Sequence, residues 1–183
     1  MKGRQGLLAV FGAFAAPVIL AAIVYQMGWF TAGVTNKGEF MPIELTLDWI
    51  LPEEASDSEW IIFYSIPDTC DERCNNALYS LNQGYQALHK LQQKAHPLVL
   101  RASQSDISTA QLKAQFNFVK VMEQQPTQQS TLAQLSSDYL YLVDPFGKVI
   151  LRYKATAEKQ QMIMITKDWM GDLKRLLKFS RTS

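Results

Sequence analysis

A long uncharged stretch near the N-terminus constrains this chain more than any other feature. No charged residue lies between Arg4 and Lys37, and residues 7–25 are almost purely apolar. As a helix that rises about 1.5 Å per residue, this run would span about 28 Å, close to the hydrocarbon core of a bilayer. Trp29 and Phe30 follow where an aromatic anchor would meet the membrane surface. The stretch therefore predicts a transmembrane helix.

A cleaved signal peptide is the competing interpretation. The apolar region of a signal peptide usually runs about 7–15 residues and ends at a small-x-small site, whereas residues 25–27 are bulky. Lys2 and Arg4 precede the apolar run, and Lys37 is the only basic residue among the forty that follow residue 30. This asymmetry predicts a cytoplasmic N-terminus. We expect residues 1–30 to form that cytoplasmic N-terminus and a single-pass anchor. In a bacterium, the anchor would lie in the inner membrane and the main domain in the periplasm.

The composition fits one small globular domain beyond the anchor. The chain has 183 residues, of which 48% are hydrophobic and 19% are charged, and one domain usually takes about 100–200 residues. A formal net charge of +1 gives no general reason to bind nucleic acid, so we expect no nucleic-acid partner. Two cysteines are too few for a four-cysteine zinc site. We expect a tether and loop at residues 31–59 and the folded domain at residues 60–183.

Strand and helix patterns alternate through this domain. Residues 60–64 are aromatic or β-branched, which predicts a buried strand, and residues 70–94 carry apolar side chains at three- and four-residue steps, which predicts an amphipathic helix. The other expected elements are an extended piece at 43–47, strands at 97–100, 118–122, 139–143 and 148–153, a turn at 144–147, and helices at 108–116 and 166–178. This order predicts an α/β fold, a thioredoxin-like mixed sheet flanked by helices.

Two cysteines, Cys70 and Cys74, lie where the first of these strands meets the first long helix. Cysteines four residues apart on a regular helix share one face, with Cα atoms about 6 Å apart, which is within the range of a disulfide. Cys70 would lie at the helix N-terminus, where unpaired amides and the helix dipole favour a thiolate. The pattern fits a redox pair, a metal-binding pair or a structural disulfide.

The chain resembles the Sco/SenC family of cytochrome oxidase assembly proteins over roughly residues 36–180. The resemblance rests on the anchor, on the C-x-x-x-C of Cys70 and Cys74 after a hydrophobic strand, and on the stretch YLVDPFGKV at residues 141–149. It extends to a divergent set of thioredoxin-like transmembrane proteins associated with bacterial oxidase assembly, which the Trp60 strand matches better. It implies a membrane-anchored, copper-handling protein with oxidase subunits or assembly factors as partners.

Two departures from the Sco pattern bear on copper. Prolines usually follow the cysteines in that family, but Asp71 and Asn75 stand in those places here. The copper-binding histidine of the family lies five residues before the tyrosine that matches Tyr141, and Ser136 occupies that place. The resemblance therefore implies a site that lacks its third copper ligand.

Neither histidine of the chain is a good replacement. His89 follows Cys74 by fifteen residues, about 22 Å along one continuous helix, and His96 lies further along the chain. Copper(I) accepts soft ligands and would bind two thiolates with a methionine. The candidate methionines, whose default role is core packing, are Met41, Met122, Met162 and Met164.

Three functions remain open at this point. In the first, the protein assists cytochrome c oxidase assembly by thiol–disulfide exchange, with Cys70 as the attacking thiolate and Cys74 resolving the mixed disulfide. In the second, it is a metallochaperone that binds copper(I) through both cysteines. In the third, it is a non-catalytic assembly factor whose cysteines form a structural disulfide.

Overall fold

The computed structural model describes residues 2–27, 36–51 and 59–179. The chain divides into two compact units, Met1–Thr35 and Asn36–Ser183. Parts of the expected tether and loop, residues 31–35 and 52–58, lie outside the described residues, as do Trp29 and Phe30.

The first unit is the helix α1, Lys2–Gln26, with Pro17 in its interior. Apolar side chains such as those of Phe11 and Phe14 are about three-quarters exposed, at 73% and 75%. In the portion of the chain that the structure covers, no helix is found that is long and apolar enough to cross a membrane. The membrane anchor stays a prediction.

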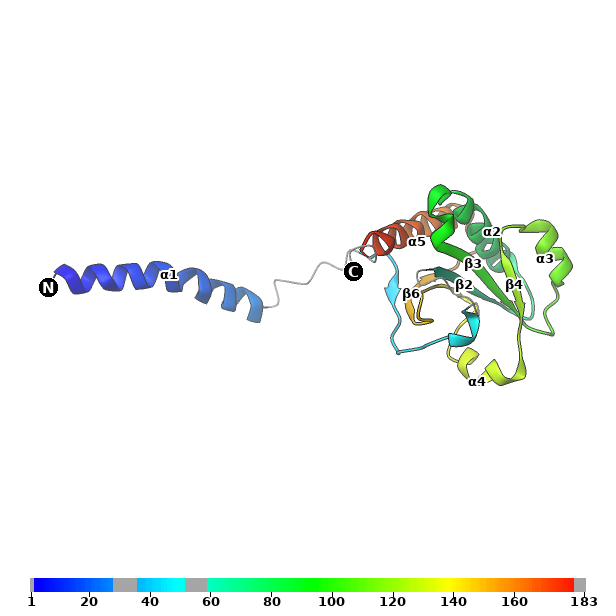
Figure 1. The fold of residues 1–183 in the computed structure, drawn as a ribbon, viewed down its shortest axis with the longest axis horizontal. Helices are drawn as coiled ribbons and strands as arrows, with labels where there is room; N and C mark the ends of the chain where they lie inside the picture. The colour runs from blue at the N-terminus through cyan, green and yellow to red at the C-terminus, as the bar shows by residue number, and fades with distance from the viewer. Residues whose placement is uncertain (1, 28–35, 52–58, 180–183) are drawn as a thin grey trace. The chain divides into compact units, whose positions relative to one another are not determined.

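The second unit is built on a six-stranded sheet with the order β1-β6-β5-β2-β3-β4 (Figure 1). Strands β2, β3 and β4 run parallel to one another, whereas β5 runs antiparallel to β2, and β6 pairs antiparallel with both β5 and β1. Their bounds are Glu39–Phe40 for β1, Trp60–Ile66 for β2, Ala95–Arg101 for β3, Lys120–Glu123 for β4, Tyr139–Val143 for β5 and Val149–Lys154 for β6. The predicted mixed sheet is confirmed.

Helices cover one face of the sheet. Side chains alternate between the faces along a strand, and Trp60, Ile62, Tyr64 and Ile66 of β2 pack on the face that carries three helices, α2, α3 and α5. These are Glu72–Gln86, Thr109–Gln115 and Lys159–Phe179. On the other face, Ile61 and Phe63 pack against the segment with the 3-10 helix Asp48–Ile50 and beside the short helix α4, Gln129–Leu132. Figure 1 shows both layers.

Three predicted boundaries are wrong. The helix expected over residues 70–94 is α2 followed by a separate 3-10 helix, His89–Lys94, because His89 takes a positive φ of 49° that ends regular helical geometry. The last helix begins at Lys159, seven residues before the predicted start at Thr166. The extended piece predicted at 43–47 is not a strand of the sheet and forms only one isolated bridge, between Thr46 and Lys148. The strand that this part of the chain adds to the sheet is β1, which precedes the predicted piece.

The helices α2 and α5 pack very closely. The indole Nε1 of the wholly buried Trp169 donates a hydrogen bond to Ser80 Oγ at 3.1 Å. A Cβ atom at Gly84 would lie 2.1 Å from Trp169 Cζ2. Only a residue without a side chain therefore fits at this crossing.

Candidate redox site

The two predicted site cysteines form a disulfide at the end of β2. The chain leaves β2 at Ile66 and enters α2 at Glu72, with Cys70 before the helix and Cys74 in its first turn. The Cα atoms of the two cysteines lie 5.2 Å apart. Asp71 caps α2, because its side chain accepts a hydrogen bond from the backbone N–H of Cys74 at 2.9 Å. The expectation that both cysteines lie on one regular helix is wrong, because this cap leaves Cys70 outside it.

The two sulfurs differ in burial. Cys74 is wholly buried and belongs to the core cluster beneath α2, together with Ala77 and Leu78. Cys70 is half-buried and packs at the edge of the same cluster. A nucleophile that arrives from water therefore meets Cys70 first.

The loop after β3 holds Cys70 in place. The backbone N–H of Cys70 donates to Asp106 Oδ1 at 2.9 Å, and the N–H of Asp106 donates to the carbonyl of Asp68 at 2.9 Å. The hydroxyl of Ser105 donates to the Pro67 carbonyl at 3.2 Å. These hydrogen bonds hold the segment that leads to Cys70 against the loop after β3, at the carboxyl edge of the parallel strands.

A charged pair flanks the disulfide. Arg73 lies between the cysteines in the sequence, and its guanidinium is 2.5 Å from Asp138 Oδ1 and 3.6 Å from Asp71 Oδ2. Asp138 immediately precedes β5, so this ion pair brings the loop before β5 to the cysteines. The sequence patterns did not identify Asp138, because no local signal links it to residues more than sixty positions earlier.

The same loop contains Ser136, the place where the resemblance puts a copper ligand. Its backbone N–H donates to the Tyr141 hydroxyl at 2.8 Å, and that hydroxyl donates to the Ser136 carbonyl at 2.9 Å. Burial raises the pKa of Tyr141 to about 12, although the backbone hydrogen bond at Ser136 opposes the shift. The backbone of Ser136 thus anchors the loop to Tyr141, and its side chain offers neither a sulfur nor an imidazole ligand for copper.

The histidines do not lie with the cysteines. His96 pairs in register with Ile61, at the opposite end of β2 from Cys70, and its Nδ1 lies 3.1 Å from Glu59 Oε2. His89 is exposed and follows the end of α2. The prediction that neither histidine reaches the cysteine pair agrees with this placement.

The candidate methionines are dispersed. Met162 is buried in the cluster that includes Cys74, whereas Met41 and Met122 pack on the other face of the sheet, and Met164 is 64% exposed. Among the residues described, no three or more His, Cys, Asp or Glu side chains are grouped to hold a metal ion. The disulfide itself supplies two sulfur donors.

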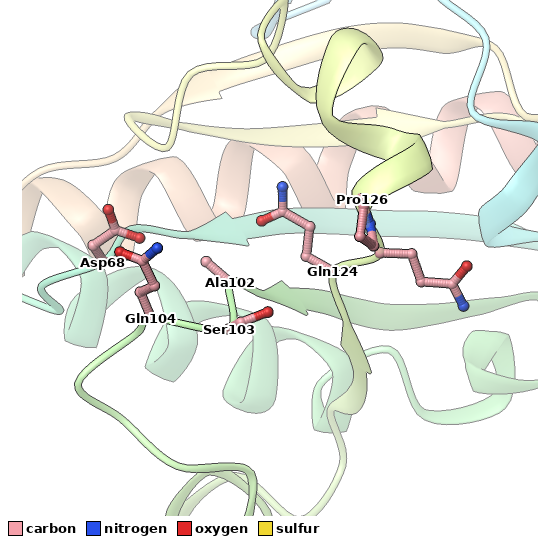
Figure 2. A pocket seen from close by; sticks show the side chains of 7 residues that line it. Asp68, Ala102, Ser103, Gln104, Gln124 and Pro126 are labelled. Atoms are coloured by element: carbon pink, nitrogen blue, oxygen red, sulfur yellow. The ribbon is translucent and has the colours of Figure 1, made fainter.

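An open pocket of about 380 Å³ lies on the same edge of the sheet. It is lined from the segments that follow β2, β3 and β4, by Asp68, Ala102, Ser103, Gln104, Gln124, Gln125 and Pro126. Figure 2 shows Asp68 and Gln104 on one side of it and Gln124 on the other. The pocket thus lies where ligands of open α/β sheets bind, outside the carboxyl ends of the strands.

Comparison with solved structures finds Sco proteins and thiol–disulfide proteins that are similar to this chain at low sequence identity. Similar solved structures include a copper-bound ScoI from Arabidopsis thaliana, with 13% identity over 64% of this chain and 86% of that one and a TM-score of 0.48. An apo Sco1 from Thermus thermophilus has 14% identity over 76% of this chain and 95% of that one, with a TM-score of 0.49. A thiol:disulfide interchange protein from Bacteroides sp. has 12% identity over 71% and 88%, with a TM-score of 0.42. These values are too low to carry a function to this chain.

A search of the curated proteins finds no match. A family model described as a transmembrane-like, thioredoxin-like, C-terminal domain matches residues 60–180, well over half of the chain. This range includes both cysteines and every strand from β2 to β6. The chain therefore belongs to the family of transmembrane-like, thioredoxin-like C-terminal domains.

Proposed function

We propose that this protein is a membrane-anchored, periplasm-facing thiol–disulfide exchange protein that assists the assembly of a copper-containing cytochrome c oxidase. The observation that carries the exchange step is a disulfide with unequal sulfurs, Cys70 half-buried and Cys74 wholly buried. Exchange between thiols and disulfides needs one accessible sulfur to attack and a second to resolve the mixed disulfide.

The reaction proceeds in two displacements. In the reduced protein, the Cys70 thiolate attacks a disulfide of the target, a new S–S bond forms, and one target sulfur leaves as a thiolate. The Cys74 thiolate then attacks Cys70, so that the Cys70–Cys74 disulfide forms and the second target sulfur leaves. Two electrons pass to the target, whose thiolates take up the two protons that the cysteine pair released. A dithiol protein must then reduce the pair again.

The oxidase role rests on the resemblance and on the donor set. Thiolates are the form of cysteine that binds copper(I), so reduction would prepare target cysteines for the metal. The chain itself offers two sulfurs, with Ser136 where the resemblance calls for a histidine. A reductant of copper-site cysteines needs no third ligand.

The anchor is proposed from α1 and its flanks. This helix has 25 residues, and residues 7–25 within it carry no charge. Its exposed Phe11 and Phe14 would face lipid. Lys2 and Arg4 before the apolar run favour a cytoplasmic N-terminus and hence a domain on the periplasmic side.

The exchange step is tested by comparing the two cysteines in the full chain, purified in detergent. Each single variant, Cys74→Ala and Cys70→Ala, keeps one thiol and is treated with glutathione disulfide. We expect Cys70 to form the mixed disulfide at least about tenfold faster than Cys74, because a buried thiol is a poor nucleophile. Equal rates, or a faster Cys74, would contradict Cys70 as the entry sulfur.

The reduction potential of the wild-type pair separates exchange from a structural role. We expect equilibrium with the glutathione couple above about −300 mV. A potential far below that value, with no exchange, would identify the bond as a structural disulfide in a non-catalytic assembly factor. Retained oxidase assembly in the Cys70→Ala, Cys74→Ala double variant would point the same way.

Copper(I) binding is the second candidate, because the two sulfurs lie within bonding distance of each other and soft thiolates suit this ion. Titration of the reduced full chain with copper(I), beside the Cys74→Ala variant, tests it. One equivalent bound by the wild type and lost in the variant would support delivery of copper; equal weak binding by both would exclude it.

A further inference from the structure

A buried tyrosine hydroxyl in the cluster that contains Cys74 has no partner among the described residues. Tyr64 belongs to β2, lies two residues before its end, and has no exposed surface. Its hydroxyl forms no hydrogen bond within the described part of the chain. Buried polar groups in proteins are nearly always paired, so an unpaired hydroxyl in the core at a candidate redox site calls for a chemical reason.

Tyr64 lies near the end of β2 from which the chain continues to Cys70. Tyr64 and Cys74 share one buried cluster on the face of the sheet that α2 covers, and Cys70 packs against that cluster. The charges of Arg73, Asp71 and Asp138, which flank the disulfide, all act on the Tyr64 hydroxyl. Burial raises the pKa of this hydroxyl far above its usual value and outweighs the opposite effect of Arg73. Tyr64 therefore stays a neutral O–H donor.

The other polar groups near Cys74 are already engaged. The backbone N–H of Cys74 donates to the cap residue Asp71. The guanidinium of Arg73 is paired with Asp138 and lies near Asp71. Within the described residues, this cluster holds two buried donors without a partner, the Tyr64 hydroxyl and the Trp60 indole N–H. Trp60 begins β2, at the end of the strand away from Cys70, so Tyr64 is the one on the side of the cysteines.

We propose that the Tyr64 hydroxyl, which is unpaired in the oxidised protein, donates a hydrogen bond to the Cys74 sulfur in the reduced protein. The inference rests on the proposed exchange function and names the residue that supports it. When a thiolate attacks Cys70, the S–S bond breaks and its electron pair stays on Cys74 Sγ as a thiolate. That sulfur is buried, so it needs a donor from the protein. Tyr64 keeps its proton and supplies the hydrogen bond.

The test removes only the hydroxyl. In Tyr64→Phe, the oxidised form loses no hydrogen bond, whereas the reduced form loses the donor to a buried thiolate. We expect the equilibrium constant for reduction by glutathione to fall about tenfold, a change of about 30 mV toward more negative potentials for a two-electron couple. Measurements use the full chain in detergent.

The matched control is Tyr153→Phe. Tyr153 is also buried, but its hydroxyl is bonded to Asp172 at 3.0 Å in the oxidised protein. This variant should destabilise both redox forms alike and leave the potential at the wild-type value. A Tyr64→Phe potential equal to wild type, in a protein that still exchanges, would overturn the role of Tyr64 alone; a wild type that does not exchange would overturn the proposed function.

A second measurement needs no variant. In protein labelled with ¹³C at the tyrosine ring carbon that bears the hydroxyl, the Tyr64 signal should move on reduction, while the Tyr153 signal stays in place. A Tyr64 signal that does not respond to reduction would contradict the hydrogen bond to Cys74.

Discussion

The buried carboxylate of Asp172 joins the first residues of the second unit to its last helix. Its Oδ2 accepts hydrogen bonds from the backbone N–H groups of Lys37 and Gly38 and from the Tyr153 hydroxyl, at 2.8, 2.9 and 3.0 Å. Asp172→Ala would leave these donors without their acceptor, and a hydrogen bond to a charged group contributes about 1.5–3 kcal/mol. We expect the free energy of unfolding to fall by about 2–4 kcal/mol in denaturant titrations. Asp168→Ala, one turn earlier and half-buried, is the control, and an equal loss there would refute the special role of Asp172.

His96 makes stability depend on pH. Burial lowers its pKa from 6.5, Lys120 lowers it further, and Glu59 raises it in part. Between 6.5 and the lower folded pKa, the unfolded chain binds a proton that the folded protein does not, so the unfolding free energy falls as pH drops through this window. His96→Gln should flatten that fall between pH 7 and pH 5, measured by urea unfolding. The exposed His89→Gln should keep the wild-type slope; identical slopes in both variants would count against the assignment.

At the scale of elements, the contact of α2 with α5 depends on Gly84. Its missing side chain makes room for the Trp169 ring. Gly84→Ala should cost about 1–3 kcal/mol of unfolding free energy through overpacking, seen as a lower urea midpoint. Gly171→Ala is the matched helical control: a Cβ there meets nothing within 4 Å, so the better helix propensity of alanine should raise stability by roughly 0.5–1 kcal/mol. A neutral Gly84→Ala would show that the helices separate easily.

Local sequence patterns predict some of these elements well and others poorly. The apolar run of β5, Tyr139–Val143, has the predicted bounds because a buried strand shows in composition alone. The end of α2 was missed because His89 adopts a positive φ without glycine or proline to signal it. The first turns of α5 were missed because the segment from Lys159 begins with polar residues and buries little besides Met162.

In the complete domain, the candidate site combines two cysteines from one local motif with groups that distant segments contribute. The spacing of Cys70 and Cys74 sufficed to predict their proximity, since four residues about a helix start limit their separation. The groups around them, Asp106 and Asp138, come from segments that only the sheet topology brings together. Long-range pairing of this kind leaves no periodic trace in a single sequence.

The attachment at Asp172 has a mechanical consequence. Any tension applied to the chain before Asn36 enters the domain at Lys37 and Gly38, which are bonded to α5. The adjoining β1 is the edge strand of the sheet, and β6 and β5 separate it from β2. Such a load would be shared between the last helix and that edge, and the strand that leads to Cys70 would be shielded from it.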